Sequence, residues 1–379
     1  MFDAIVVGVG SMGSAACYEM SRRGLNVLGI EQFDIAHELG SHGGQSRLIR
    51  KAYFEHPDYV PLLIEAYKGW SELELLAKRQ LYWETGIIYF GPSENGIIEG
   101  VKYASSIHNI DLEKIEIKEA MLRWPQFSVP KKIECLFEPK AGFLSPENAI
   151  LSFVNIARQL GCLINTNERV ESIKENDGIV EVVTSKDVYV AKKVILTAGP
   201  YTDQLIEMPV RLKVTSQLLA WTKPIDNSIV ELGNMPCWMV AEEERPGLFY
   251  GFPQLDNSFE GPSGLKIAYH RPGKVMDNLM IEEFDSTGER AILSEVLNNY
   301  LPNLKGEISL FKQCRYTYTP DEHFILDFHP NFNGNVLIAA GFSGHGFKFV
   351  PVIGKAISDM AISGKTELPV GFLKLDRFG

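Results

Sequence analysis

The chain has 379 residues, which is enough for two domains that each have a core. Its hydrophobic content of 45% and charged content of 22% are ordinary for a globular protein. The net charge of −11 argues against nucleic acid or an anionic membrane as a partner, although a local arginine pair can still bind a small anion. We find no signal peptide and no apolar run near the roughly 20 residues that span a bilayer, so we expect a cytoplasmic protein.

The cysteines are few, odd in number and widely spaced, and no two of them form a Cys-x-x-Cys pair. This spacing predicts neither a zinc site nor a disulfide framework. We therefore expect free thiols and no bound metal. The five are Cys17, Cys135, Cys162, Cys237 and Cys314.

The first 31 residues predict a βαβ unit, with strands at 3–7 and 26–30 and a helix at 14–23 that ends at Gly24. The turn between strand and helix matches G-x-G-x-x-G. The first glycine permits a tight turn, the second lets a pyrophosphate approach the backbone, and the third allows close packing of helix on strand. Glu31 then stands where a carboxylate can accept hydrogen bonds from ribose hydroxyls. The motif predicts a dinucleotide site but does not separate FAD from NAD.

A glycine-rich loop with two arginines follows at residues 40–50. Arg47 and Arg50 would share a face in a helix and point apart in a strand. The planar charged fork of arginine suits a carboxylate ligand, but surface ion pairing is its usual fate, and this loop alone leaves the two interpretations even. His42, taken alone, is more often a structural hydrogen-bonding residue than a catalyst.

The rest of the chain alternates between α/β segments and segments that predict a half-buried sheet. Further α/β elements are a helix at 145–161 capped by Ser145, a hairpin at 170–184 turning at Asp177-Gly178, and strands at 194–197 and 335–340. Between them, residues 214–222 and 265–270 predict strands of a half-buried sheet. We expect an α/β fold, with a Rossmann-like nucleotide-binding domain from segments 1–50, 145–205 and 310–379. Segments 51–144 and 206–309 then form an inserted substrate domain on a mixed, largely antiparallel sheet.

One thiol stands out near a second glycine loop. Cys314 has polar and aromatic neighbours, and the adjacent Arg315 could favour its thiolate, although a buried structural thiol is the commoner case. The loop at 341–346 precedes a helix with Pro351 in its first turn, so its amides and Lys348 would favour a negatively charged ring. The usual alternative for Lys348 is a solvated lysine on a helix surface.

Residues 264–270 alternate with period two, which puts Lys266, Ala268 and His270 on one face. These side chains could project over a cofactor. A solvent-facing edge strand is the alternative, and the pattern alone slightly favours it. Tyr250 is by ordinary expectation a packed aromatic residue.

Together these motifs resemble the family of monomeric sarcosine oxidase and N-methyl-tryptophan oxidase over essentially the whole chain. The resemblance rests on Gly-x-Gly-Ser-Met-Gly, Gly-Ser-His-x-Gly-x-Ser-Arg-x-Ile-Arg, Tyr-Gly-Phe-Pro, Leu-Lys-x-x-Tyr-His, Cys-x-Tyr-Thr, Pro-Asp-Glu-x-Phe-Ile and Gly-Phe-Ser-Gly-His-Gly-Phe-Lys-Phe. It implies a monomeric FAD enzyme that oxidises a secondary amine bearing a carboxylate with O2. The products would be the demethylated amino acid, formaldehyde and hydrogen peroxide.

The resemblance also implies roles for individual residues. Cys314 would carry the flavin through an 8α-thioether, Arg50 and Lys348 would grip the substrate carboxylate, and Lys266 would activate O2. Tyr250 and His270 would line the pocket near the amine. The residues expected to bind the cofactor are Gly8, Gly10, Ser11, Met12, Gly13, Glu31, Ser41, His42, Ser46, Arg47, Val170, Gly199, Cys314, Gly341, Gly344, Gly346, Phe347 and Lys348.

Two features depart from the family pattern. Gly43 follows His42 where a second histidine is common, and residues 241–247 form a longer, more acidic segment beside the expected pocket. Two alternatives stay open. One is an oxidase of another amine, such as pipecolate, glycine or a fructosyl amino acid, and the other is a flavin-binding subunit without turnover.

Overall fold

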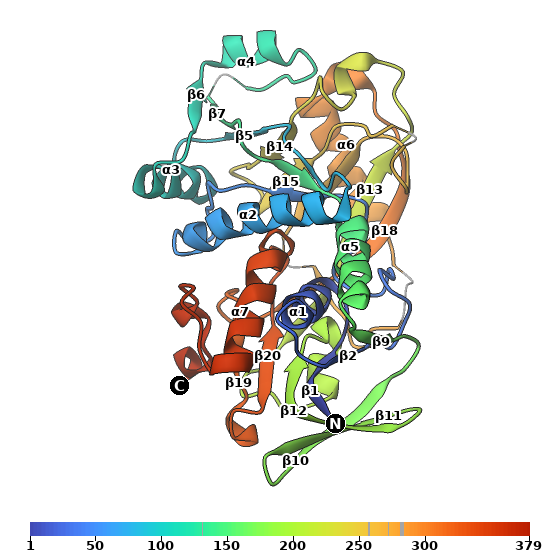
Figure 1. Ribbon diagram of the computed structural model, residues 1–379. Coiled ribbons are helices and arrows are strands. Elements are labelled where there is room, and N and C mark those ends of the chain that lie inside the picture. The colour runs from blue at the N-terminus through green and yellow to red at the C-terminus, as the bar shows by residue number, and fades with distance from the viewer. Residues whose placement is uncertain (131, 257, 272, 281–283) are drawn as a thin grey trace.

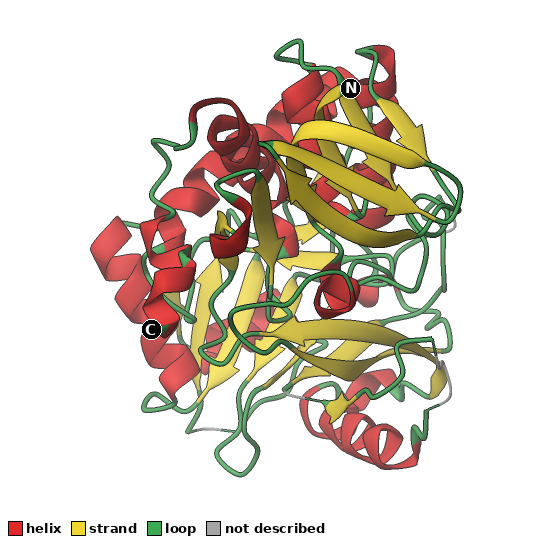
Figure 2. Cartoon of the chain, turned by 90° about the horizontal axis from the view of Figure 1, so that it is seen from below, coloured by secondary structure: helices red, strands yellow, loops and turns green. Residues whose placement is uncertain are grey.

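Two large mixed sheets, each with strands from distant parts of the chain, form the framework of the protein (Figure 1, Figure 2). The computed structural model describes residues 1–130, 132–256, 258–271, 273–280 and 284–379. Helices lie beside and between the sheets (Figure 2). The architecture is the mixed α/β fold that the sequence predicts.

The helices are α1 Ser11–Ser21, α2 Tyr59–Ala77, α3 Gly96–His108, α4 Ile117–Arg123, α5 Pro146–Gln159, α6 Thr287–Tyr300 and α7 Val350–Ser363. The first sheet contains β1 Phe2–Val7, β2 Val27–Ile30, β9 Leu163–Asn165, β10 Val170–Asn176, β11 Ile179–Thr184, β12 Val188–Leu196, β19 Ile325–Phe328 and β20 Val336–Ala340. The second contains β5 Ile87–Gly91, β6 Glu113–Ile115, β7 Glu134–Glu138, β13 Lys213–Thr222, β14 Cys237–Val240, β15 Leu248–Gly251, β16 Lys266–His270, β17 Lys274–Val275 and β18 Ile308–Tyr318. A small sheet joins β3 Arg47–Ile49, β4 Tyr82–Trp83 and β8 Gly142–Leu144.

The first sheet has a parallel centre in the order β9-β2-β1-β12-β20. The carboxyl ends of these strands therefore meet at one edge, where ligands bind in open α/β sheets. The predicted βαβ unit is confirmed, but α1 begins at Ser11 rather than at residue 14. The amide of Ser14 already donates to the carbonyl of Gly10, 2.9 Å away, so helical hydrogen bonding starts inside the glycine motif.

Most of the remaining local predictions are confirmed. β10 and β11 form the expected hairpin, and its turn residues Asp177 and Gly178 have φ of 51° and 78°. Ser145 is the N-cap of α5, but its side chain makes no capping hydrogen bond and accepts one from Asn148 instead. Across the described ranges, no helix combines the length and apolar character that a bilayer crossing requires.

The second sheet contradicts one prediction. β16 pairs with β13 on one side and β15 on the other, so it is an interior strand and not a solvent-facing edge. Ile267 and Tyr269 pack in the cluster that contains α6 residues, and Ala268 faces the opposite side. Both faces are covered, which explains why a lysine in this strand is buried.

The first sheet draws on the predicted segments 1–50, 145–205 and 310–379. β18, however, begins at Ile308 and pairs with β13 in the second sheet. The boundaries of the two domains stay predictions.

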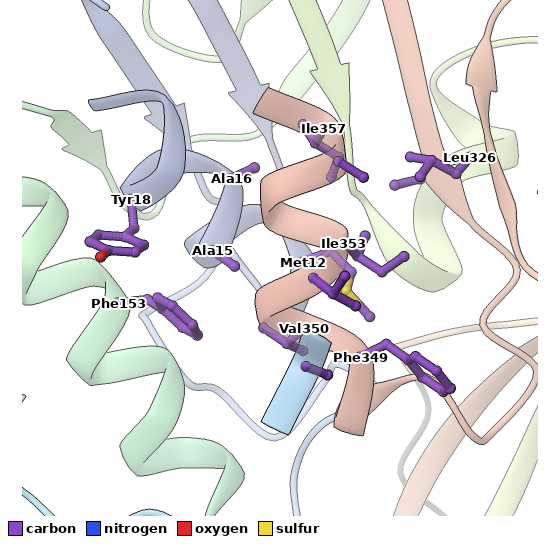
Figure 3. Close-up of a cluster of buried hydrophobic side chains, with 14 of the residues drawn as sticks. Met12, Ala15, Ala16, Tyr18, Phe153, Leu326, Phe349, Val350, Ile353 and Ile357 are labelled. Carbon is purple, nitrogen blue, oxygen red and sulfur yellow. The ribbon is translucent and has the colours of Figure 1, made fainter. Parts of the chain in front are cut away.

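Helices from the two ends of the chain pack against each other on one face of the first sheet. Figure 1 shows α1 and α7 side by side, and Figure 3 shows Ala15 and Ala16 beside α7, whose Ile353 and Ile357 point towards Leu326. A glycine permits this approach. A Cβ on Gly354 of α7 would stand 2.6 Å from the Cβ of Ala15 and 2.9 Å from its carbonyl carbon.

We expect Gly354→Ala to lower the free energy of unfolding by about 1–2 kcal/mol, because overpacking two buried helices outweighs the helix propensity gained. Urea denaturation would measure the change. Gly288→Ala in the first turn of α6 is the control, since open space surrounds its added methyl group and we expect no loss. Equal stability of both variants would show that α1 and α7 can separate slightly without cost.

Candidate active site

A cavity of about 400 Å³ runs from the carboxyl edge of the first sheet to the face of the second. Residues of the first glycine motif, Glu31 and 197–201 line one end. The loop at 341–348 and side chains of β14–β16 and β18 line the other. Most of the predicted site residues line this space, but Gly13, Ser46, Lys266 and Cys314 lie behind the lining.

Close backbone contacts explain the glycines at the sheet end of the cavity. Gly8 has φ of 88°, and a Cβ there would stand 2.7 Å from the carbonyl oxygen of Thr197. A Cβ on Gly13 would stand only 1.9 Å from the carbonyl oxygen of Gly8. The hydroxyl of Thr197 donates to that same oxygen at 2.7 Å. The loop is thus held against β12, and the start of α1, at Ser11 and Met12, lines the cavity.

Glu31 is buried at the end of β2 and lines the cavity. Its carboxylate accepts hydrogen bonds from the amides of Val9 at 2.9 Å and Phe33 at 3.1 Å. These bonds fix the carboxylate beside the glycine motif while leaving acceptor positions unused. The position is the one predicted for a group that binds ribose hydroxyls.

The loop after β2 brings an unpaired histidine nitrogen into the cavity wall. His42 is 3% exposed, and its Nε2 has no hydrogen-bond partner within the described residues. Burial lowers the pKa of His42 to about 4, so its ring is neutral at pH 7. A buried polar atom without a partner points to a bound group that is not protein.

Cys314 is 1% exposed and lies beside Arg47 and not beside the guanidinium of Arg315. The Nη2 nitrogen of Arg47 lies 3.3 Å from the sulfur of Cys314. The same sulfur lies 3.4 Å from the carbonyl oxygen of Ser41. Arg315 instead donates to the carbonyl of Leu279, because successive residues of β18 face opposite sides. The expectation that Arg315 favours the thiolate is therefore wrong, and Arg47 is the cation in contact.

Arg50 and Lys348 meet at the inner end of the cavity. Of the helix and strand interpretations, the strand is confirmed for Arg47, which is the first residue of β3. Arg50 follows the end of that strand. Both arginines line the cavity. Arg50 is 2% exposed and donates to both oxygens of Glu55 at 2.7 Å. Lys348 is also buried, so a solvated lysine is excluded, and its ammonium donates to the carbonyl of His345 at 2.7 Å.

The charges at this end perturb one another. Burial and then the charge of Arg50 lower the pKa of Lys348 to about 7. Burial alone would raise the pKa of Glu55, but the charges of Arg50, His345 and Lys348 lower it to about 2. A carboxylate thus already pairs with the Nη2 nitrogen of Arg50, while its Nη1 donates to the carbonyl of Ala52 at 2.9 Å.

Lys266 lies behind the loop that carries Arg47. Its nitrogen is 2.5 Å from the carbonyl oxygen of Gly44 and 2.7 Å from that of Ser46. The ring of Phe252 lies 4.7 Å away. Burial lowers the pKa of Lys266 well below its ordinary value, and the charge of Arg47 lowers it further.

Neutral aromatic side chains line the wall above Arg50. Burial lowers the pKa of His270 to about 4 and raises the pKa of Tyr250. The ring centroids of Tyr250 and His270 are 6.5 Å apart, and that of Tyr316 lies 5.8 Å from His270. A Cβ on Gly344 would stand 2.3 Å from the Tyr316 ring, so this glycine lets the second loop close over β18.

Sequence reasoning did not single out Glu55 or the apolar wall made by Phe54, Met239 and Leu248. A signal for Glu55 was present, because it is a carboxylate five residues after an arginine that was already under consideration. The apolar wall gave none, since these side chains come from separate strands and loops. Within the described residues, no group of three or more His, Cys, Asp or Glu is placed to hold a metal ion.

Comparison with known proteins gives consistent findings. Residues 3–360 match the family described as FAD dependent oxidoreductase (DAO). The chain is 36% identical to the monomeric sarcosine oxidase of Bacillus sp. (strain NS-129), over 99% of this chain and 97% of that one. It is 32% identical to the N-methyl-L-tryptophan oxidase of Salmonella dublin, over 100% and 99%. The solved structure of NikD, an unusual amino acid oxidase essential for nikkomycin biosynthesis, has the same fold, with a TM-score of 0.86, 23% identity and coverage of 98% and 97%.

The pKa of Lys348 predicts how the site binds carboxylates. We expect the affinity for acetate to fall by up to about tenfold per pH unit above pH 7, because the free lysine is then neutral and binding must take up a proton. Below pH 7 the lysine is already charged and the affinity should level off. Calorimetry in two buffers of different ionisation enthalpy would measure the proton uptake.

Lys348→Met is the matched control, and its acetate affinity should be weaker and independent of pH, since Arg50 keeps its charge throughout. A wild-type affinity that stays constant between about pH 6 and pH 9, without proton uptake, would contradict this account.

Proposed function

The chain belongs to the FAD dependent oxidoreductase family, and from this membership we propose that it is an FAD-dependent oxidase of N-methyl amino acids. The reaction uses O2 and gives the amino acid, formaldehyde and hydrogen peroxide. The observation that carries the proposal is the buried pair of Arg50 and Lys348 at the inner end of the cavity. A flavin-binding subunit without turnover would not need such a clamp.

The residues present fit FAD. The amides at the start of α1 face the cavity where the pyrophosphate of a dinucleotide would lie, and Glu31 has acceptor positions for the ribose. The unpaired Nε2 of His42 offers a partner for a polar group of the cofactor. The other predicted cofactor residues on the cavity wall, among them Val170, Gly199 and Phe347, come from the same two ends of the cavity.

Arg50 and Lys348 would hold the substrate carboxylate. Glu55 already pairs with the Nη2 nitrogen of Arg50, so a substrate carboxylate would replace one anion by another instead of desolvating a free cation. Two cations at fixed positions would orient the amino acid and point its methyl group along the cavity.

The wall of His270, Tyr250 and Tyr316 would then face the amine. None of these groups carries a negative charge at pH 7, so none of them forms an ion pair with an ammonium ion. The nearby cations further disfavour an ammonium ion at this position. A neutral amine gives up a hydride more readily than an ammonium ion. Bound FAD supplies the redox chemistry, accepting the hydride and passing the electrons to O2.

Lys266 would assist the reaction with O2 from behind the loop of Ser46. Its nitrogen donates to the carbonyls of Gly44 and Ser46, with the Phe252 ring close by. A group that is charged or can become charged in this buried place would stabilise negative charge forming on oxygen.

Cys314 is the proposed point of attachment of the flavin, as an 8α-thioether. Its position beside Arg47, which lines the cavity, supports this assignment. A monomeric, cytoplasmic protein with the two-domain division described above completes the proposal.

A panel of N-methyl amino acids assayed for peroxide tests the function. Sarcosine and N-methyl-L-tryptophan are the smallest and largest N-methyl amino acids of the panel. Pipecolate, glycine and a fructosyl amino acid represent the alternative amine substrates. Peroxide and formaldehyde in equal amounts would support demethylation. Peroxide without formaldehyde would select an alternative amine, and silence across the panel would favour the non-catalytic subunit.

We expect wild-type protein precipitated in acid to keep its flavin in the pellet and Cys314→Ala to release it. The absorbance of pellet and supernatant measures the fraction attached. Cys237→Ala removes a different buried thiol and should leave attachment intact. Complete release from the wild type would overturn the role of Cys314.

We expect Lys266→Met to slow the reaction of the dithionite-reduced enzyme with O2 by about 10²–10³-fold, because a buried group that stabilises forming negative charge is lost. Anaerobic reduction by substrate should change much less. Stopped-flow absorbance separates the two steps. Lys274→Met, at an exposed lysine of β17, is the control, and a reduced Lys266→Met enzyme that reacts with O2 at the normal rate would remove Lys266 from this role.

A further inference from the structure

One loop of the cavity wall supplies the hydrogen-bond partners of Lys266. Its three acceptors within the described residues are the carbonyls of Gly44 and Ser46 and the hydroxyl of Ser46, at 2.5, 2.7 and 3.3 Å. The rings of Trp221 and Phe252 lie 5.6 and 4.7 Å from the same nitrogen. A ring attracts an ammonium group but does not direct its N–H bonds. The nitrogen of Lys266 therefore lies where this loop places its acceptors.

Glu147 holds the same loop from another side. It lies in the first turn of α5, and its Oε1 accepts hydrogen bonds from the amides of Gly44 at 2.8 Å and Gln45 at 3.0 Å. A carboxylate that accepts from two successive amides fixes the direction of both peptide groups. Its place at the start of a helix also favours its negative charge.

Glu147 and Lys266 act on opposite ends of one peptide group. In the peptide that joins Gly44 to Gln45, the amide donates to Glu147 and the carbonyl accepts from Lys266. An anion at the amide and a cation at the carbonyl polarise the peptide in the same direction, so each charge strengthens the hydrogen bond of the other. The carboxylate is thus linked to the lysine through a single peptide group.

The side chain of Gln45 anchors the loop independently of Glu147. Its Oε1 accepts from the indole nitrogen of Trp221 at 3.1 Å, and its amide nitrogen donates to the carbonyl of Pro262 at 3.0 Å. Loss of the carboxylate would therefore release the peptide group of Gly44 and Gln45 without detaching the loop. The expected consequence is a displaced lysine in a folded protein.

We propose that Glu147 is a positioning residue for the reaction with O2, acting on Lys266 through the peptide of Gly44 and Gln45. This inference rests on the proposed function, in which Lys266 assists that reaction. Glu147 lies behind the cavity lining, so it acts on the contents of the cavity through the groups that it holds.

The test measures the reaction of dithionite-reduced holoenzyme with O2 by stopped-flow absorbance. It compares the wild type, Glu147→Ala, Lys266→Met and the double variant. We expect Glu147→Ala to slow the reaction by about 10–100-fold, because a displaced group stabilises the forming charge less well. The double variant should react at the rate of Lys266→Met alone, because Glu147 then has no lysine to position. Anaerobic reduction by substrate should stay near the wild-type rate in Glu147→Ala.

Glu74→Ala is the matched control. The Oε1 of Glu74 also accepts from two successive amides, those of Leu81 at 2.7 Å and Tyr82 at 2.8 Å, but Glu74 does not line the cavity. Its variant should react with O2 at the wild-type rate. Glu147→Gln keeps an acceptor oxygen and should recover most of the lost rate. If Glu147→Ala fails to hold flavin, Glu147→Asp, with a side chain one methylene shorter, takes its place in the comparison.

Three results would overturn the proposal. The first is a wild-type rate in Glu147→Ala. The second is a loss that recurs in full when Lys266 is already methionine, because Glu147 would then act without the lysine. The third is a Glu147→Gln enzyme as slow as Glu147→Ala, because an acceptor in place would then not suffice. In each case a slow Lys266→Met enzyme leaves the proposed role of Lys266 intact. Dithionite reduces the flavin without an amine, so the comparison remains decisive even if the amine panel yields no peroxide.

Discussion

The cavity depends on one electrostatic constraint, which is that several cations are buried side by side in a protein of net charge −11. Each must find an acceptor, because an unpaired buried charge is very costly. Glu55 supplies one for Arg50, and loop carbonyls supply the rest. Lys266 donates to the carbonyls of Gly44 and Ser46, and Glu147 accepts from the amides of Gly44 and Gln45. Gly44 and Gln45 have φ of 113° and 72°, so buried polar partners on both sides hold this loop in its conformation.

The same constraint decides what the cavity binds. Arg50 and Lys348, held by one carboxylate and by loop carbonyl oxygens, would favour an anion at this end of the cavity. A flavin that gains negative charge on reduction and an amino acid carboxylate both meet that requirement. The low pKa of His270 and the neutral tyrosines beside it make a second region, which carries no charge and where an uncharged amine can lie. An amino acid with its carboxylate in the first region and a neutral amine in the second would match both.

Sequence reasoning succeeded where the relevant contacts are local. The glycine motif, the hairpin at Asp177-Gly178 and the break at Gly364 each follow from backbone conformations that few other residues adopt. It failed for β16, because alternation cannot reveal that two further strands and α6 cover both faces. It also chose Arg315 over Arg47 as the neighbour of Cys314, since adjacency in sequence places side chains on opposite faces of a strand. The roles assigned to individual residues rest on the family resemblance and follow neither from local contacts nor from strand patterns.

The central position of β12 in the first sheet bears on how the protein is made. Its last residues pair with β1 on one side and β20 on the other, so the sheet joins residues 2–7, 194–196 and 336–338. During synthesis, the edge of β12 that pairs with β20 stays open until residues 336–338 leave the ribosome. Such long sequence separations slow folding and expose strand edges to aggregation. The second glycine loop and Lys348 come later still, so a cofactor held by both ends of the cavity would stabilise only the finished chain.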